Sequence, residues 1–200
     1  VLLMRLVLAS QSPSRRMLLE QAGVRPVLRP AHIDEDAVIA ALGDVPPATT
    51  VATLARAKAE TAIAQFPDDV VVGCDSMLLL DDTLLGKPHT VDETIRRWKA
   101  QRGKEAHLLT GHAVWFGGEW VVDTITTAIR FGDVSDADIE AYARSGQPLE
   151  CAGAFTLEAL GSWFIDSIDG DPTSVIGLSM PLLRRCLYRF GLDASDFWTA

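Results

Sequence analysis

The 200-residue sequence has few cysteines and fewer basic than acidic residues, and both shortages exclude classes of protein. Its three cysteines, Cys74, Cys151 and Cys186, are odd in number and match no zinc-ligand spacing. We therefore expect reduced thiols in the core instead of a disulfide framework. Lys and Arg total 18 against 27 for Asp and Glu, which gives a net charge of −9. Such a field repels phosphate backbones, so sequence-independent nucleic-acid binding is disfavoured.

Long apolar runs and targeting signals are also missing. No apolar stretch approaches the roughly 18 residues that a membrane span needs. The N-terminal region also lacks the succession of a basic region, an apolar run and a small-residue cleavage site that is typical of a signal peptide. We therefore expect a cytoplasmic protein with no membrane partner. The sequence also has no internal repeat, low-complexity tract or long linker, while 48% hydrophobic residues suffice for a core. We predict one domain over residues 1–200, although length alone does not separate one core from two lobes.

Short apolar runs that alternate with helical patterns predict an α/β fold. Leu6–Ala9 is expected to form a buried strand, and Ser12 to cap a helix over Pro13–Ala22. The Ala-rich segment Val51–Gln65 predicts a second helix. The β-branched run Val70–Val72 predicts an interior strand, parallel to the first.

The ends of these strands are where a binding site is expected. A strand that runs into a helix start at Pro13 brings unpaired N–H groups and positive dipole to one point. Gly73–Ser76 follows the second strand, and ligands bind at the carboxyl edge of open α/β sheets. The intervening chain through His32 and Glu35 is interpreted as a polar loop. An acidic protein that binds an anion must concentrate its positive charge in one such place.

The second half of the chain predicts a mixed sheet with flanking helices. Met77–Leu85 is typical of a hairpin that turns at Asp81-Asp82, and Thr90 with Glu93 predicts a capping box for a helix through Arg102. Further predicted elements are an antiparallel hairpin of Glu105–Phe116 and Glu119–Phe131, a helix from Ser135 or Asp136 to Arg144, strands Phe155–Leu157 and Trp163–Ile168, and a helix Pro181–Phe190.

Common catalytic motifs are absent. Gly86-Lys87 is followed by Pro88 and has no Walker A glycine before it, and no dinucleotide-binding glycine fingerprint occurs. Ser179 lacks the second glycine of a nucleophile elbow, so a serine hydrolase is disfavoured. The four histidines form no zinc-binding HExxH motif and are expected at the surface or in structural roles.

A scattered set of polar residues remains as candidate chemistry. It consists of Ser10, Ser12, Arg15 and Arg16 around the first helix start, Lys58 on the second helix, Asp75 after the central strand, and Lys87 in a Gly-Lys-Pro turn. Taken singly, each has an ordinary structural explanation as solvated surface, a snorkelling lysine or a cap. Five segments together are more specific: Leu8–Arg16, Val72–Ser76, Gly86–Pro88, Cys151–Phe155 and Val175–Leu178.

In this order and spacing, the chain resembles the Maf family of nucleoside triphosphate pyrophosphatases from near its start to about Gly191. The resemblance implies a two-lobed α/β fold, a mixed sheet flanked by helices with a cleft between the lobes, similar to that of inosine triphosphatases. It also implies a cytosolic homodimer. The implied reaction hydrolyses a nucleoside or deoxynucleoside triphosphate to the monophosphate and pyrophosphate with a divalent metal, Mg or Mn.

The resemblance carries roles to individual residues. Ser10 and Arg15 match the phosphate-binding serine and arginine of the family, with Arg16 beside them. The implied catalytic residues are Asp75 as proton acceptor, Lys58 in a Leu-Ala-x-x-Lys-Ala segment and Lys87 in the Gly-Lys-Pro turn. Glu35, at an early acidic position, and Asp75 are the metal-ligand candidates.

Three positions bear on the choice of base. In the thymidine and uridine triphosphate branch they carry Arg, Thr and Gln, whereas this chain has Ser14, Ser76 and Glu158. A carboxylate only accepts hydrogen bonds, which suits the adjacent donors of guanine better than a thymine or uracil edge. Glu158 and Asp171-Pro172 resemble the 7-methyl-GTP branch, although that branch has Trp and Gln at the first two positions. We predict a guanine-type preference, with dTTP or UTP as the alternative.

Two further functions stay open from sequence alone. A nucleotide-binding regulator of cell division would bind triphosphates through the same Arg and Lys residues without turnover. A phosphosugar or nucleotidyl transferase would share the phosphate-binding chemistry but needs an acceptor pocket. The presence of both Asp75 and Lys87 favours hydrolysis, because a pure binder has little need of a base beside its phosphates.

Overall fold

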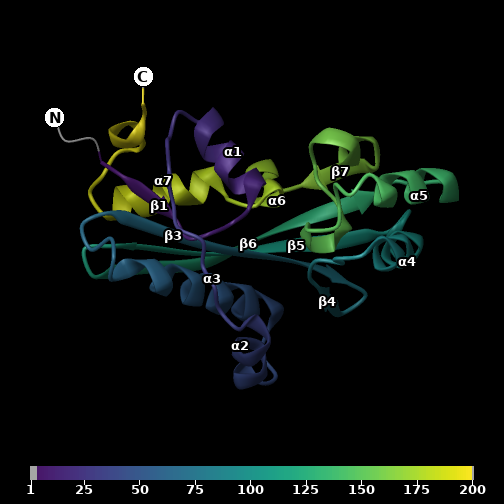
Figure 1. The fold of residues 1–200 in the computed structure, drawn as a ribbon, viewed down its shortest axis with the longest axis horizontal. Helices are drawn as coiled ribbons and strands as arrows, with labels where there is room; N and C mark the ends of the chain where they lie inside the picture. The colour runs from purple at the N-terminus through teal and green to yellow at the C-terminus, as the bar shows by residue number, and fades with distance from the viewer. Residues whose placement is uncertain (1–3, 200) are drawn as a thin grey trace. The chain divides into compact units, whose positions relative to one another are not determined.

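A computed structural model describes residues 4–199, which form a mixed seven-stranded sheet flanked by helices (Figure 1). The strand order is β2-β1-β3-β5-β6-β7, and β4 pairs with β3. The strands are β1 (Leu6–Leu8), β2 (Val27–Leu28), β3 (Val70–Leu80), β4 (Thr83–Leu85), β5 (Glu105–Phe116), β6 (Glu119–Phe131) and β7 (Ile165–Asp169). The α/β prediction is confirmed.

The helices are α1 (Pro13–Gln21), α2 (Glu35–Leu42), α3 (Pro47–Ile63), α4 (Val91–Gln101), α5 (Asp136–Arg144), α6 (Pro172–Ile176) and α7 (Met180–Arg189). Three short 3₁₀ helices are η1 (Ala152–Ala154), η2 (Ala159–Trp163) and η3 (Ala194–Phe197). Within the described residues, none of these helices is both long and apolar enough to cross a membrane.

The chain divides into two compact units. Among the described residues, unit 1 comprises 4–75, 110–125 and 177–199, and unit 2 comprises 76–109 and 126–176. In unit 1, β1 pairs in parallel with both β2 and β3. The parallel pairing of β1 with β3 was predicted from the apolar runs, and that with β2 was not. Helix α3 lies on one face of these strands, and α1 and α7 lie on the other (Figure 1).

Glycines in two strands let α3 lie directly on the sheet. A Cβ atom added at Gly73 of β3 would be 2.3 Å from the carbonyl oxygen of Ala55, and one at Gly111 of β5 would be 2.2 Å from that of Val51. At this contact, Ala55 and Ala59 of the helix each present a side chain no larger than a methyl group to the core. Small residues on both sides therefore set the position of α3. Its start at Pro47 lies upstream of the expected Val51.

Strand β3 differs from its predicted form. The sequence predicted a strand that ends at Val72 and delivers Gly73–Ser76 to its carboxyl edge, but β3 continues without a break to Leu80. The prediction is wrong because Gly73 acts as a packing contact for α3 and not as a strand terminator. Asp75 consequently lies inside a strand. The predicted hairpin turn is confirmed, since Asp81 and Asp82 have positive φ angles of 47° and 62°.

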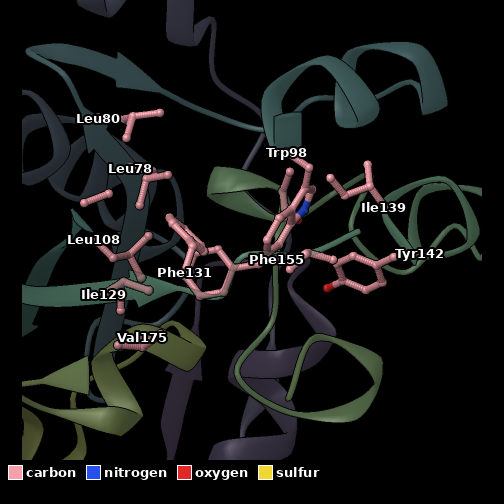
Figure 2. Packing of buried hydrophobic residues seen from close by; sticks show 13 residues of the cluster. Leu78, Leu80, Trp98, Leu108, Ile129, Phe131, Ile139, Tyr142, Phe155 and Val175 are labelled. Atoms are coloured by element: carbon pink, nitrogen blue, oxygen red, sulfur yellow. The ribbon is translucent and has the colours of Figure 1, made fainter. Parts of the chain in front are cut away.

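Unit 2 has an aromatic core centred on Trp98 of α4 (Figure 2). The indole is fully buried and meets Phe131 edge-on, with ring centroids 5.3 Å apart, and Tyr142 at 5.9 Å. Its Nε1 donates a hydrogen bond of 2.7 Å to the Ala154 carbonyl. Each such edge-to-face pair adds about 0.5–1.5 kcal/mol beyond area burial. The core therefore ties α4 to η1.

Other predicted elements were confirmed or corrected. The hairpin of β5 and β6, the helices α4, α5 and α7 and strand β7 agree with prediction to within about two residues. The strand expected at Phe155–Leu157 is absent from the described chain, because Ala154 and Ala159 beside it have positive φ angles that a strand cannot contain. Helices α2 and α6 were not predicted, and Asp34 caps α2 by accepting from the Ala37 amide.

Candidate active site

The start of α1 holds Arg15 in a fixed orientation. Ser12 caps the helix, and the Ser10 hydroxyl after β1 accepts from the Ser12 amide at 3.1 Å and from Arg15 Nη1 at 3.3 Å. Arg15 is only 9% exposed, and its Nε donates to the Gly177 carbonyl at 2.7 Å. The structure therefore brings together the predicted phosphate-binding pair, Ser10 and Arg15.

Gly177 is suited to this contact for two reasons. Its φ of 142° favours glycine, and an added Cβ atom would lie 3.1 Å from both Cγ and Nε of Arg15. The residue belongs to the Val175–Leu178 segment noted in the sequence, but the sequence does not reveal that its carbonyl holds Arg15. That contact joins residues 162 positions apart.

Arg16 lies apart from Arg15. Successive helix residues point about 100° apart, so the two side chains leave α1 in different directions. Arg16 is exposed and donates to Glu20 at 2.7 Å, one helical turn along. It lines an open cavity of about 340 Å³ with Ser10, Gln11, Ser12, Pro13, Met17, Glu20, Leu28 and Pro30. The guanidinium of Arg16 is thus already paired with a carboxylate, that of Glu20.

Lys58 bridges two carboxylates. Its Nζ lies 2.7 Å from Glu35 Oε1 and 2.8 Å from Asp75 Oδ1. Helix α3 brings Lys58 here because Gly73, two residues before Asp75, lets the helix pack closely on β3. Glu35 is the first residue of α2, not part of the polar loop expected from sequence. The structure therefore brings three predicted site residues together, with two carboxylates around the ammonium group of Lys58.

Asp75 combines burial with incomplete pairing. The residue is 7% exposed, and burial raises the pKa of its carboxyl above the ordinary value, while Lys58 and Arg15 oppose this rise and Glu35 adds to it. Oδ1 accepts from Lys58, but the buried Oδ2 has no hydrogen-bond partner within residues 4–199. One oxygen is anchored and the other is left to interact with a ligand or water.

The remaining catalytic candidate, Lys87, lies in unit 2. Its turn is fastened through the Gly86 carbonyl, which accepts from Arg97 Nη1 at 2.6 Å and from the Gly153 amide at 3.3 Å. Sequence reasoning missed Arg97, because a basic residue on an amphipathic helix carries no signal of this contact. Lys87 itself is exposed.

The base-specificity candidates fall in different places. Ser14 is half-buried on α1, and Ser76 is half-buried on β3. Glu158 of unit 2 is half-buried. Burial raises the pKa of the Cys151 thiol, the charge of Glu158 adds to this rise, and the charge of Lys87 lowers the pKa. Burial dominates and brings the Cys151 pKa to about 11, so this thiol is a poor nucleophile.

The two carboxylates that contact Lys58 are candidate ligands for a metal ion. No group of three or more His, Cys, Asp or Glu able to hold a metal ion occurs in the described part of the chain. Mg²⁺ in nucleotide sites, however, uses one or two carboxylates and takes its other ligands from water and phosphate. The unpartnered Asp75 Oδ2 and the nearby Glu35 fit that smaller requirement.

Proteins with similar sequences identify the family of this chain. The sequence matches the family described as Maf-like protein over residues 5–190. Proteins named nucleoside triphosphate pyrophosphatase are 64% identical in Corynebacterium efficiens (98% of this chain, 100% of the relative), 51% in Nocardia farcinica (96% of each) and 50% in Rhodococcus jostii (97% and 96%). The chain therefore belongs to the Maf-like protein family.

Proposed function

We propose that this chain is a nucleoside triphosphate pyrophosphatase, a hydrolase that splits the α–β phosphoanhydride bond. The observation that carries the proposal is the buried Asp75 carboxylate, with one oxygen on Lys58 and the other without a hydrogen-bond partner in the described part of the chain. A buried acid whose pKa is perturbed by burial and by specific charges is typical of a catalytic site. The names of the relatives support the same reaction.

The basic residues supply the positive charge that a triphosphate requires. The protein carries a net charge of −9, so binding depends on local cations. Arg15 presents a planar guanidinium whose orientation Gly177 and Ser10 fix, which suits contact with phosphate oxygens. We propose that Lys58 and Lys87 act as additional point charges that neutralise the triphosphate and the departing pyrophosphate.

The proposed hydrolysis is a single displacement at the α phosphorus. A water oxygen forms the new P–O bond, the α–β bridging P–O bond breaks, and its electron pair leaves with pyrophosphate. Asp75 Oδ2 accepts the proton of the attacking water. Burial raises the pKa of the carboxyl, and Lys58 on Oδ1 opposes that rise and so favours the ionised form that can accept a proton. Most of the rate enhancement then comes from positioning and charge stabilisation.

We also propose that a divalent cation, Mg²⁺ or Mn²⁺, takes part. Glu35 would hold it together with phosphate oxygens and water. Asp75 would join these ligands in the alternative in which it orients the attacking water through the metal instead of accepting its proton. Bound there, such a cation neutralises phosphate charge and acts as a Lewis acid. The homodimer and the absence of a nucleic-acid partner stay predictions from the sequence.

The decisive experiment measures pyrophosphate release from ordinary, deoxy and base-modified triphosphates with Mg²⁺ or Mn²⁺, comparing wild type with Asp75→Asn. We expect the variant to lose about 10²–10⁴-fold in rate, the range of a general base. Asp69→Asn is the matched control, because Asp69 is also 7% exposed and paired with a basic residue, Arg5.

Near-normal release by Asp75→Asn would contradict the proposed role of Asp75. If wild type binds triphosphates without releasing pyrophosphate, the chain is a nucleotide-binding regulator instead. If release requires an added acceptor, the chain is a transferase.

We further propose that Glu158 selects a guanine-type base, such as 7-methylguanine. Glu158 directly precedes η2, and its carbonyl accepts from Thr156 Oγ1 at 2.6 Å. In Glu158→Gln we expect the preference to move toward dTTP and UTP by about tenfold in kcat/KM, because an amide both accepts and donates. An unchanged ranking of substrates would contradict this assignment.

A further inference from the structure

Arg15 depends on a main-chain segment that is itself held by a buried histidine. His112 lies within β5 and is 1% exposed, and its Nε2 accepts a buried hydrogen bond of 2.8 Å from the Ser179 amide. A ring nitrogen that accepts carries no proton, so the imidazole is neutral with its proton on Nδ1. Ser179 in turn caps α7 by accepting from the Leu182 amide at 3.2 Å.

The segment between the two contacts is short and tightly packed. The Gly177 carbonyl accepts from Arg15 Nε, and two residues later the Ser179 amide donates to His112. Leu178 between them is fully buried. Because both ends are hydrogen-bonded and the middle is packed, the position of Ser179 determines the position of the Gly177 carbonyl.

Two consecutive residues of β5, Gly111 and His112, contact two different parts of the site. Gly111 receives the backbone of α3, the helix that carries Lys58. Side chains alternate between the two faces of a strand, so His112 points to the face opposite the one that Gly111 presents to α3. There it contacts Ser179, at the start of α7.

We propose that His112 is a positioning residue for Arg15, acting through Ser179 and Gly177 to fix the plane of the guanidinium. The inference rests on the proposed function of Arg15 in phosphate binding. Without an acceptor at position 112, the buried Ser179 N–H loses its hydrogen bond to the side chain there. Because a buried N–H without an acceptor costs free energy, the segment is expected to shift until the N–H meets another acceptor. The Gly177 carbonyl would move with it, and Arg15 would lose its alignment with the phosphates.

The test uses two substitutions at one position. His112→Leu removes the acceptor with little change in volume, and His112→Gln keeps a neutral acceptor oxygen at similar reach. We expect His112→Leu to raise KM for the triphosphate about tenfold and to weaken binding of inorganic pyrophosphate similarly, with His112→Gln recovering most of both. His107→Leu, at an exposed position on the same strand, is the matched control and should leave both values unchanged.

A double-mutant cycle separates this role from a general effect on folding. In an Arg15→Gln background, His112→Leu should change pyrophosphate affinity less than twofold, because its effect passes through Arg15. Equal losses in both backgrounds, or a Gln variant no better than the Leu variant, would overturn the inference. Pyrophosphate binding reads the effect even if wild type proves to lack hydrolytic activity, so a failure of the proposed function stays distinguishable.

Discussion

At the scale of the residue, the ionised form of the buried Asp75 side chain destabilises the folded protein. Burial raises its pKa in the folded protein above the unfolded value, and the charges of Lys58 and Arg15 offset only part of that rise. A raised carboxyl pKa means that the folded state binds the proton more tightly than the unfolded state does. Its stabilising contribution is therefore present below the unfolded pKa of about 4 and is lost as the pH rises through the folded pKa. At neutral pH the ionised carboxylate costs stability, as is common for catalytic groups.

Asp75→Asn should therefore unfold at the same temperature as wild type, or at a higher one, at pH 7. The amide replaces a buried charge, and the advantage should disappear below about pH 4, where Asp75 is protonated in both states. Thermal unfolding followed across this pH range measures the difference. Asp69→Asn should have the opposite sign at neutral pH, because it weakens the two hydrogen bonds that Asp69 accepts from Arg5. A loss of several degrees in Asp75→Asn at pH 7 would contradict the expectation.

At the scale of the element, the contact of α3 with β3 decides where Lys58 lies. Gly73 and Gly111 let the helix backbone approach the sheet to a distance that no other residue permits. Local sequence predicted the helix well, since Ala-rich segments favour helices. It did not predict the continuous β3, because glycine inside an apolar run is ordinarily a strand breaker and only the packed helix shows its use.

Gly73→Ala should destabilise the protein by about 3 kcal/mol or more, the upper range for overpacking, because the added methyl group would lie 2.3 Å from the Ala55 carbonyl oxygen. Displacement of α3 should also separate Lys58 from Asp75 and reduce pyrophosphate release. Chemical denaturation gives the stability change. Gly86→Ala is the control, since its new Cβ would meet only Met77 Cε at 3.8 Å. Equal stability of the two variants would show that α3 adjusts freely.

At the scale of the whole molecule, the two units have three strands in common. Strands β3, β5 and β6 each contribute residues to both units, so neither unit is a continuous piece of chain. Unit 1 has a cluster formed mostly by Ala and Val side chains, such as Ala55 and Val71, together with Trp115, and unit 2 has the aromatic core around Trp98. A substitution that destabilises the core of one unit should therefore also lower the stability of these strands in the other unit.

Trp98→Phe, in unit 2, should lower the stability of both units together. It removes the hydrogen bond to Ala154 and part of a fully buried ring, at a cost of about 2–3 kcal/mol. Hydrogen exchange under conditions of global unfolding should show the same loss of protection in peptides from α3 and from α4. A loss confined to unit 2 would show that the shared strands do not couple the two cores.

The sequence by itself determined the fold class, most element boundaries and the family, because caps, turns and apolar runs depend on neighbouring residues. Ser12, Thr90 and Ser135 act as caps where predicted. Only the tertiary structure decided that Glu35 reaches Lys58, and that Arg15 is held by the Gly177 carbonyl. These contacts join residues far apart in the chain, and their geometry depends on how closely α3 and the segment before α7 pack on the sheet, which no local pattern encodes.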